Sequence, residues 1–128
     1  MRTKINSVLA LFFLFFMLSL TSVKAQTYCD QTLRFCMATS YSSGDMQTSD
    51  TGFYTSVPSV IYYSASIEPY GSNHYGFVWI LYGDGDYILE SNNEGFKSDN
   101  GQFSSPGYQT IEIFAEARDA KSYVSVGW

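Results

Sequence analysis

Few side chains in this sequence could carry out acid–base or nucleophilic chemistry. His74 is the only histidine, so a serine or cysteine nucleophile would have to use it as the base. No serine lies in a G-x-S-x-G elbow. Asp84, Asp86 and Glu90 could supply paired carboxylates for glycoside hydrolysis, but a chain this short leaves little room for a substrate cleft. We therefore predict a protein without catalytic activity, in which His74 is an ordinary loop residue.

Oxygen ligands of the kind that calcium prefers follow the apolar run over 77–82. Segment 98–105 (SDNGQFSS) also approaches the calcium motif of βγ-crystallins, although Phe103 stands where that motif requires a hydroxyl. No cofactor is our first prediction, and a βγ-crystallin-like calcium module is kept as an alternative. Its ligands, expected in loops at one end of the fold, would come from Asp84, Asp86, Glu94, Asp99 and Asn100.

The two cysteines, Cys29 and Cys36, both lie in the part of the chain that we expect to be exported. In an oxidising compartment they should pair and close a small loop. Their spacing is not C-x-x-C, and a metal site would need more cysteine or histidine than the sequence holds.

Eleven tyrosines form the most conspicuous aromatic population, and all of them follow the first 25 residues. Most should pack in cross-strand pairs with the hydroxyl at the surface. The functional alternative is a face of exposed rings that contacts a sugar or a protein partner. The candidates for such a face are Tyr62, Tyr63, Tyr70, Tyr75 and Tyr87.

Residues 1–25 have the pattern of a cleaved secretory signal peptide. Arg2 and Lys4 precede an apolar run over 8–20, and residues 23–25 (VKA) give a small-x-small cleavage site. Residues 26–128 should then form a single domain that is secreted, periplasmic or at the cell surface, without insertion into the membrane. This part holds four basic and twelve acidic residues, a net charge of −8 that argues against nucleic acid as a partner.

The mature region reads as all-β. Helical periodicity is absent, β-branched and aromatic residues dominate, and Gly, Asn, Asp and Ser clusters interrupt the chain at short intervals. We expect a sandwich of about seven to eight strands, with a polar loop region over 91–105. The predicted strands cover 33–41, 53–57, 60–67, 76–82, 87–90, 108–117 and 122–128.

The stretch 76–86 (GFVWILYGDGD) should be the central strand of this domain. Its six consecutive apolar residues would fill both faces, which predicts a strand covered on both sides with the Trp79 indole in the core. Gly83 and Gly85 allow positive φ on either side of Asp84, whose side chain can close a tight turn.

Three segments together resemble the polycystic kidney disease (PKD) domain, an immunoglobulin-like β-sandwich, over about residues 57–126. Segment 57–66 (VPSVIYYSAS) is similar to its P-x-x-V-x-F-x-A strand, and 79–85 (WILYGDG) to its W-x-F-G-D-G signature. Segment 103–119 is similar to F-x-x-P-G-x-Y-x-V-x-L-x-A-x-D. The tryptophan lies one residue too far from the first glycine, and Tyr108 comes one residue early. By this resemblance the structural residues are Trp79, Leu81, Gly83, Asp84, Gly85, Pro106, Gly107, Ile111 and Ile113.

The resemblance implies a secreted, non-catalytic module with a binding or structural role in protein–protein or protein–carbohydrate contact. An extracellular protein or carbohydrate would be the partner. A small secreted inhibitor or effector, acting through a loop, is the other alternative that the sequence leaves open.

Overall fold

A computed structural model describes residues 25–128, which fold into nine β-strands and no helix. Except for Ala25, the predicted signal peptide lies outside the described residues, and within them no helix is long and apolar enough to cross a membrane. The strands are β1 (Ala25–Asp30), β2 (Phe35–Ser42), β3 (Gln47–Thr55), β4 (Ser59–Pro69), β5 (Tyr75–Tyr82), β6 (Gly85–Asn92), β7 (Lys97–Ser105), β8 (Gln109–Arg118) and β9 (Ala120–Gly127).

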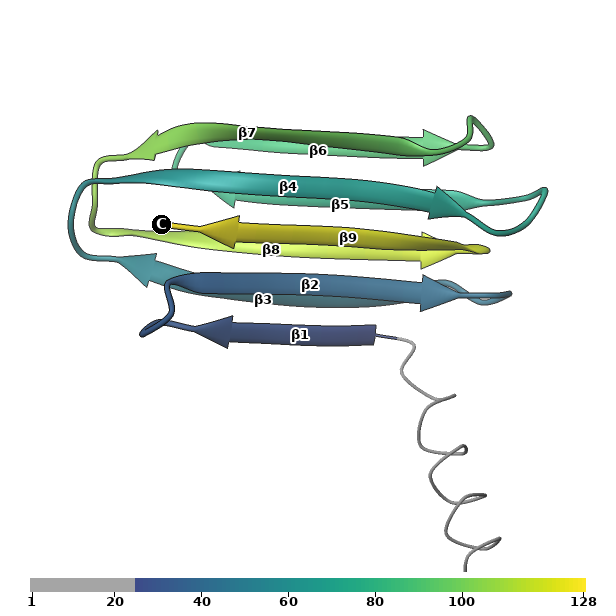
Figure 1. The fold of residues 1–128 in the computed structure, drawn as a ribbon, viewed down its shortest axis with the longest axis horizontal. Helices are drawn as coiled ribbons and strands as arrows, with labels where there is room; N and C mark the ends of the chain where they lie inside the picture. The colour runs from purple at the N-terminus through teal and green to yellow at the C-terminus, as the bar shows by residue number, and fades with distance from the viewer. Residues whose placement is uncertain (1–24) are drawn as a thin grey trace, which may run out of the picture.

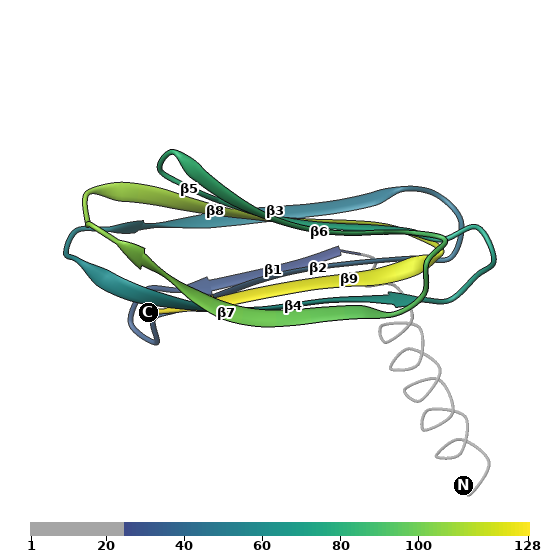
Figure 2. The same ribbon diagram turned by 90° about the horizontal axis from the view of Figure 1, so that it is seen from above.

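The strands form two antiparallel sheets that lie face to face (Figures 1 and 2). Sheet A has the order β1-β2-β9-β4-β7, and sheet B has the order β3-β8-β5-β6. The last strand, β9, lies in the middle of sheet A between β2 and β4. With β1 as an added edge strand, this is the strand order of an eight-stranded jelly roll.

The predicted sandwich of strands is confirmed, but its immunoglobulin-like order is not observed. An immunoglobulin-like domain pairs its last strand with the neighbouring C-F-G strands, whereas here β9 pairs with β2 and β4. The resemblance to PKD domains depended on the strand pattern over 57–66 and on two segments built around the turn motifs Gly-Asp-Gly and Ser-Pro-Gly. Such motifs fix local reversals of the chain and say nothing about which distant strands pair.

Two strands arise where none was expected. β1 pairs with β2 at the edge of sheet A, and β7 falls inside the predicted loop region. The sequence of β7, KSDNGQFSS, has few apolar residues because it is an edge strand. Polar side chains suit such a strand, since they discourage pairing with other molecules.

The core lies between the sheets and is built from small and branched aliphatic side chains. Inward positions alternate with outward ones along each strand, as the pleat requires. Ile111 and Ile113 of β8 face inward and are fully or almost fully buried. The buried cluster comprises Cys36, Ala38, Phe53, Ile61, Ala65, Ile67, Val78, Ile80, Ile111, Ile113, Ala115, Val124 and Val126.

The β5 strand differs from its prediction in one respect that matters for function. Val78 and Ile80 are buried between the sheets, but Trp79 and Leu81 lie on the outer face of sheet B and are only partly buried. The placement of the Trp79 indole in the core was therefore wrong. Sheet B has no second layer on its outer side among the described residues, so alternation along β5 leaves every second apolar residue at the surface.

Glycines shape the turn after β5 and the turn before β8. β5 and β6 are joined by Gly83 and Asp84, and Gly83 has φ of 56°, which fits a type II′ hairpin turn. Gly85 does not have a positive φ; it must be small because the Tyr82 ring lies 2.8 Å from the place of a Cβ. Gly107, after Pro106, has φ of 86°.

Three further contacts stabilise the first hairpin and position Trp128. Cys29 of β1 and Cys36 of β2 are direct cross-strand partners and form the predicted disulfide. Trp128 stacks on Phe53 of the opposite sheet, with ring centroids 3.8 Å apart and planes 4° from parallel. The same residue donates its backbone N–H to the Arg34 carbonyl.

Candidate functional site

A row of large side chains crosses the outer face of sheet B. In register, Trp79 of β5 is the partner of Phe114 on β8 and of Ile88 on β6. Phe114 is in turn the partner of Asp50 on β3, so the row runs through all four strands. The exposed fraction of Ile88 is 51%, and Trp79 and Phe114 are partly exposed. The β5–β6 hairpin and the more distant strand β8 therefore form one apolar surface, which we call the aromatic platform (Phe77, Trp79, Ile88 and Phe114).

The aromatic rings of the platform have defined positions. The Trp79 Nε1–H donates to Oδ2 of Asp86 at 3.2 Å, which fixes one edge of the indole towards β6. Phe77 packs edge-on against Phe114, with ring centroids 6.1 Å apart. A ring that is held by neighbours loses little conformational entropy when a ligand stacks on it.

Two shallow depressions lie on either side of the Trp79–Phe114 pair. The first, of about 360 Å³, is almost wholly apolar and is lined by Phe77, Ile88 and the Trp79 edge together with Asp86. The second, of about 540 Å³, extends towards β3, where Gly52 has no side chain to fill it. Its polar lining includes the carboxylates of Asp50 and Glu112. The face thus offers an apolar surface and hydrogen-bond acceptors side by side.

Carboxylates surround the platform on the same face. The register places Glu112 and Asp86 on one side of the row, as the two partners of Leu81, and Glu116 and Glu90 on the other, as the partners of Phe77. Burial, and then the charges of Glu90 and Glu116, raise the pKa of Tyr75, which lies at the end of this face. Within the described residues the one ion pair is Lys97 with Glu94, so these carboxylates have no ion-pair partner in the fold.

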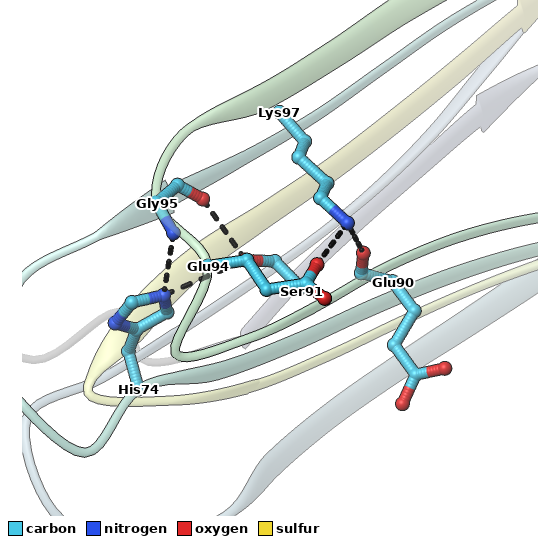
Figure 3. A network of polar contacts seen from close by, with 6 residues as sticks. All are labelled: His74, Glu90, Ser91, Glu94, Gly95 and Lys97. Carbon is cyan, nitrogen blue, oxygen red and sulfur yellow. Dashed lines mark hydrogen bonds and ion pairs between the residues drawn. The ribbon is translucent and has the colours of Figure 1, made fainter.

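His74 has a structural environment. It is 6% exposed, and its Nε2 accepts the Gly95 N–H at 3.2 Å, so Nδ1 carries the hydrogen donated to the Gly71 carbonyl at 3.1 Å. Figure 3 shows the ring beside Ser91, whose hydroxyl donates to the Gly95 carbonyl. The His74 carbonyl also accepts the Asn93 N–H at 3.1 Å. Nδ1 is therefore used within the β4–β5 loop, and Nε2 and the His74 carbonyl join this loop to the β6–β7 loop.

The predicted calcium ligands do not come together. Asp84 lies in the β5–β6 turn and Glu94 in the β6–β7 loop, at opposite ends of β6, so the prediction that they share one end was wrong. Asp86 accepts from Trp79, Asp99 from the Tyr87 hydroxyl, and Glu94 pairs with Lys97. In the part of the chain that the structure describes, no three acidic, cysteine or histidine side chains converge as a metal site would require.

The five candidate tyrosines do not share a face. Tyr62 is on the outer side of sheet A and Tyr70 is in the β4–β5 loop, with exposed fractions of 59% and 50%. Tyr75 lies on the outer face of sheet B. Tyr63 and Tyr87 point between the sheets and contact each other, with ring centroids 4.5 Å apart.

The inner tyrosines belong to a packed aromatic cluster at the β6–β7 side of the sandwich. Tyr82 stacks on Phe103 at 3.9 Å between ring centroids, next to Tyr63. The Tyr87 hydroxyl donates to Oδ2 of Asp99 at 2.9 Å. Burial, followed by this hydrogen bond and the Asp99 charge, raises the pKa of Tyr87 far above its ordinary value.

Sequence reasoning missed most of the platform. Phe77, Phe114, Ile88, Asp50 and Glu112 were not singled out, because each is unremarkable within its own strand. One signal was available in the run 77–81, which is apolar on both faces. Because one face of each sheet in a two-layer sandwich meets solvent, such a run indicates an exposed apolar surface on that face. Only the pairing of β3, β8, β5 and β6 shows which other side chains join it.

Comparison with known proteins gives a distant similarity in fold. No protein-family model matches the chain, and no curated protein matches it. Among solved structures it is similar to one described as "Family 16 Carbohydrate Binding Module-2", with a TM-score of 0.44 and 9% sequence identity over 81% of this chain and 83% of that chain.

Proposed function

We propose that residues 26–128 form a secreted, non-catalytic binding module that holds a sugar ring against the aromatic platform. The observation that carries the proposal is the row formed by Asp50, Phe114, Trp79 and Ile88 across sheet B. A sugar ring has an apolar face of C–H groups and a rim of hydroxyls. An indole beside acceptor side chains satisfies both parts of such a ligand.

The placement of polar groups supports a sugar more than a purely apolar ligand. The Asp86 carboxylate already accepts the Trp79 N–H, so the indole N–H is satisfied before a ligand arrives. Asp50 and Glu112 line the second depression and can accept hydrogen bonds from the hydroxyls of a ring stacked on Trp79. A hydroxylated ring on the platform would thus have two acceptors beside Phe114, namely its cross-strand partner Asp50 and its same-face neighbour Glu112.

The environment of His74 supports a non-catalytic role. Both ring nitrogens of this residue, the base that a nucleophilic mechanism would need, are engaged in hydrogen bonds to the backbone of two loops. A secreted location is part of the proposal because the predicted signal peptide precedes the domain. Protein recovered from the medium should begin at Gln26, and recovery of only full-length, cell-associated chain would contradict secretion.

The test is binding of neutral oligosaccharides, such as cello-, xylo- and N-acetylated chito-oligomers, measured by isothermal titration calorimetry. Trp79→Ala should weaken binding about tenfold or more, roughly 1.4 kcal/mol, because stacking area is lost. Tyr62→Ala removes an aromatic ring that is more exposed than Trp79 from the opposite sheet and should leave affinity unchanged. Trp79→Tyr keeps a smaller aromatic ring and is the milder variant. Unchanged affinity in Trp79→Ala would contradict the proposal. Failure of the wild type to bind any of these sugars would also contradict it.

A further inference from the structure

The outer face of sheet B carries a negative charge around the aromatic platform, and this charge restricts the class of ligand. Five carboxylates lie on the outer face of sheet B, and the only cationic side chain on that face is Arg118, at the end of β8. The five residues are Asp50, Asp86, Glu90, Glu112 and Glu116. Such a face creates a negative potential, which attracts cationic ligands and opposes anionic ones.

Asp50 and Glu112 are the two carboxylates best placed to meet a ligand beside the indole. Asp50 is the cross-strand partner of Phe114, and Glu112 follows Phe114 by two residues on the same face. The two are diagonal neighbours, with Cβ atoms about 7–8 Å apart in a regular sheet. Glu112 itself faces Gly52, so the space between the two carboxylates is open.

Neither of these carboxylates has a hydrogen bond or an ion pair to another residue within the range 25–128. A neutral sugar covering them would remove water from two charges and return only hydroxyl hydrogen bonds. An ammonium group between them would compensate the charge and make charge-assisted hydrogen bonds to both. Uncompensated charge beside the stacking surface therefore favours a ligand with a positive charge near its apolar face.

We infer that the preferred ligand of the aromatic platform is a polymer of amino sugars with free amino groups, of the glucosamine type. This inference deepens the proposed function and depends on it. The apolar face of the ring stacks on Trp79, and the protonated amine lies in the depression between Asp50 and Glu112. A pyranose ring holds its amine rigidly beside its C–H face, so little conformational entropy is lost in matching two adjacent depressions. A lysine-rich peptide would have to immobilise long side chains to achieve the same match.

The experiment compares a glucosamine hexamer with its fully N-acetylated counterpart, which has the same length and no charge. Titrations at about pH 5.5 keep both the ligand amines and ordinary carboxyl groups charged. The deacetylated hexamer should bind about tenfold more tightly, and salt should reduce this preference because the charges are exposed. The double variant Asp50→Asn/Glu112→Gln should reduce the preference, measured as the ratio of the two affinities, to about twofold or less.

A matched control removes two charges elsewhere. Asp45→Asn/Glu68→Gln changes one loop carboxylate and one carboxylate on the outer side of sheet A, and it should keep the full preference. Equal affinity for the two hexamers, or a preference that persists in Asp50→Asn/Glu112→Gln, would overturn this inference and leave neutral sugar binding intact. Loss of binding to both hexamers in the wild type would overturn the proposed function itself. Oligolysine that binds as tightly as the amino sugar, unaffected by Trp79→Ala, would show nonspecific attraction and also overturn the inference.

Discussion

Replacing His74 by alanine should be among the most damaging single changes outside the aliphatic core. The substitution removes the partners of the Gly71 carbonyl and of the Gly95 N–H, which lie in two different loops. Each buried group left without a partner costs about 1–3 kcal/mol. Because both loops reach the surface, water can satisfy part of the loss, and we expect a total of about 2–4 kcal/mol.

Urea unfolding followed by circular dichroism measures this loss. With a denaturant slope of about 1–1.5 kcal/mol per molar urea, in the lower part of the range for small proteins, a loss of about 2–4 kcal/mol lowers the midpoint by about 1.3–4 M. His74→Asn keeps an amide that can donate to the Gly71 carbonyl and loses only the contact with Gly95, so about half of the effect should remain. Asn92→Ala, at an exposed position of β6, is the matched control and should change stability by less than about 0.5 kcal/mol. A midpoint for His74→Ala equal to that of the control would refute the view that this ring joins the two loops.

The remaining predictions concern the two faces of β5 and the alkaline limit of stability. Ile80→Ala should lower the free energy of unfolding by about 2–5 kcal/mol because it leaves a cavity between the sheets. Leu81→Ala, on the outer face, should lower it by about 1 kcal/mol or less. Similar losses for both variants in the same urea assay would mean that the two faces of β5 are assigned wrongly. Folding raises the Tyr87 pKa above its unfolded value of about 10, so the stability contributed by its protonated hydroxyl is complete below about pH 10 and is lost as the pH rises towards the folded-state pKa. Tyr87→Phe, which cannot donate to Asp99, should show a smaller alkaline decline in melting temperature than the wild type, and an identical pH profile would contradict this assignment.

The sequence was sufficient for the class of fold because that class depends on local patterns. Short β-branched and aromatic runs separated by turn residues predicted strands, and the two strands it missed are edge strands. β7 was missed because an edge strand exposes most of its side chains and can be as polar as a loop. The disulfide was predictable because the sequence holds only two cysteines, both after the predicted signal peptide.

The candidate site was much harder to predict, for a reason specific to β-sheets. Trp79 was recognised as important, but a strand that is apolar on both faces does not reveal which face meets the second sheet. Asp50 and Phe114 join Trp79 only through pairings between segments far apart in the chain. Turn motifs and alternation are local, so they contain no information on strand order or on cross-strand register.

The contrasting environments of the two tryptophans give this protein an intrinsic optical reporter. Trp128 is stacked on Phe53 between the sheets, so its emission should follow global unfolding. Trp79 lies on the outer face of sheet B, where a bound ring would displace water from the indole and shift its emission to shorter wavelength. In a Trp128→Phe background, the fluorescence of a single indole would therefore report occupancy of the site without any attached dye.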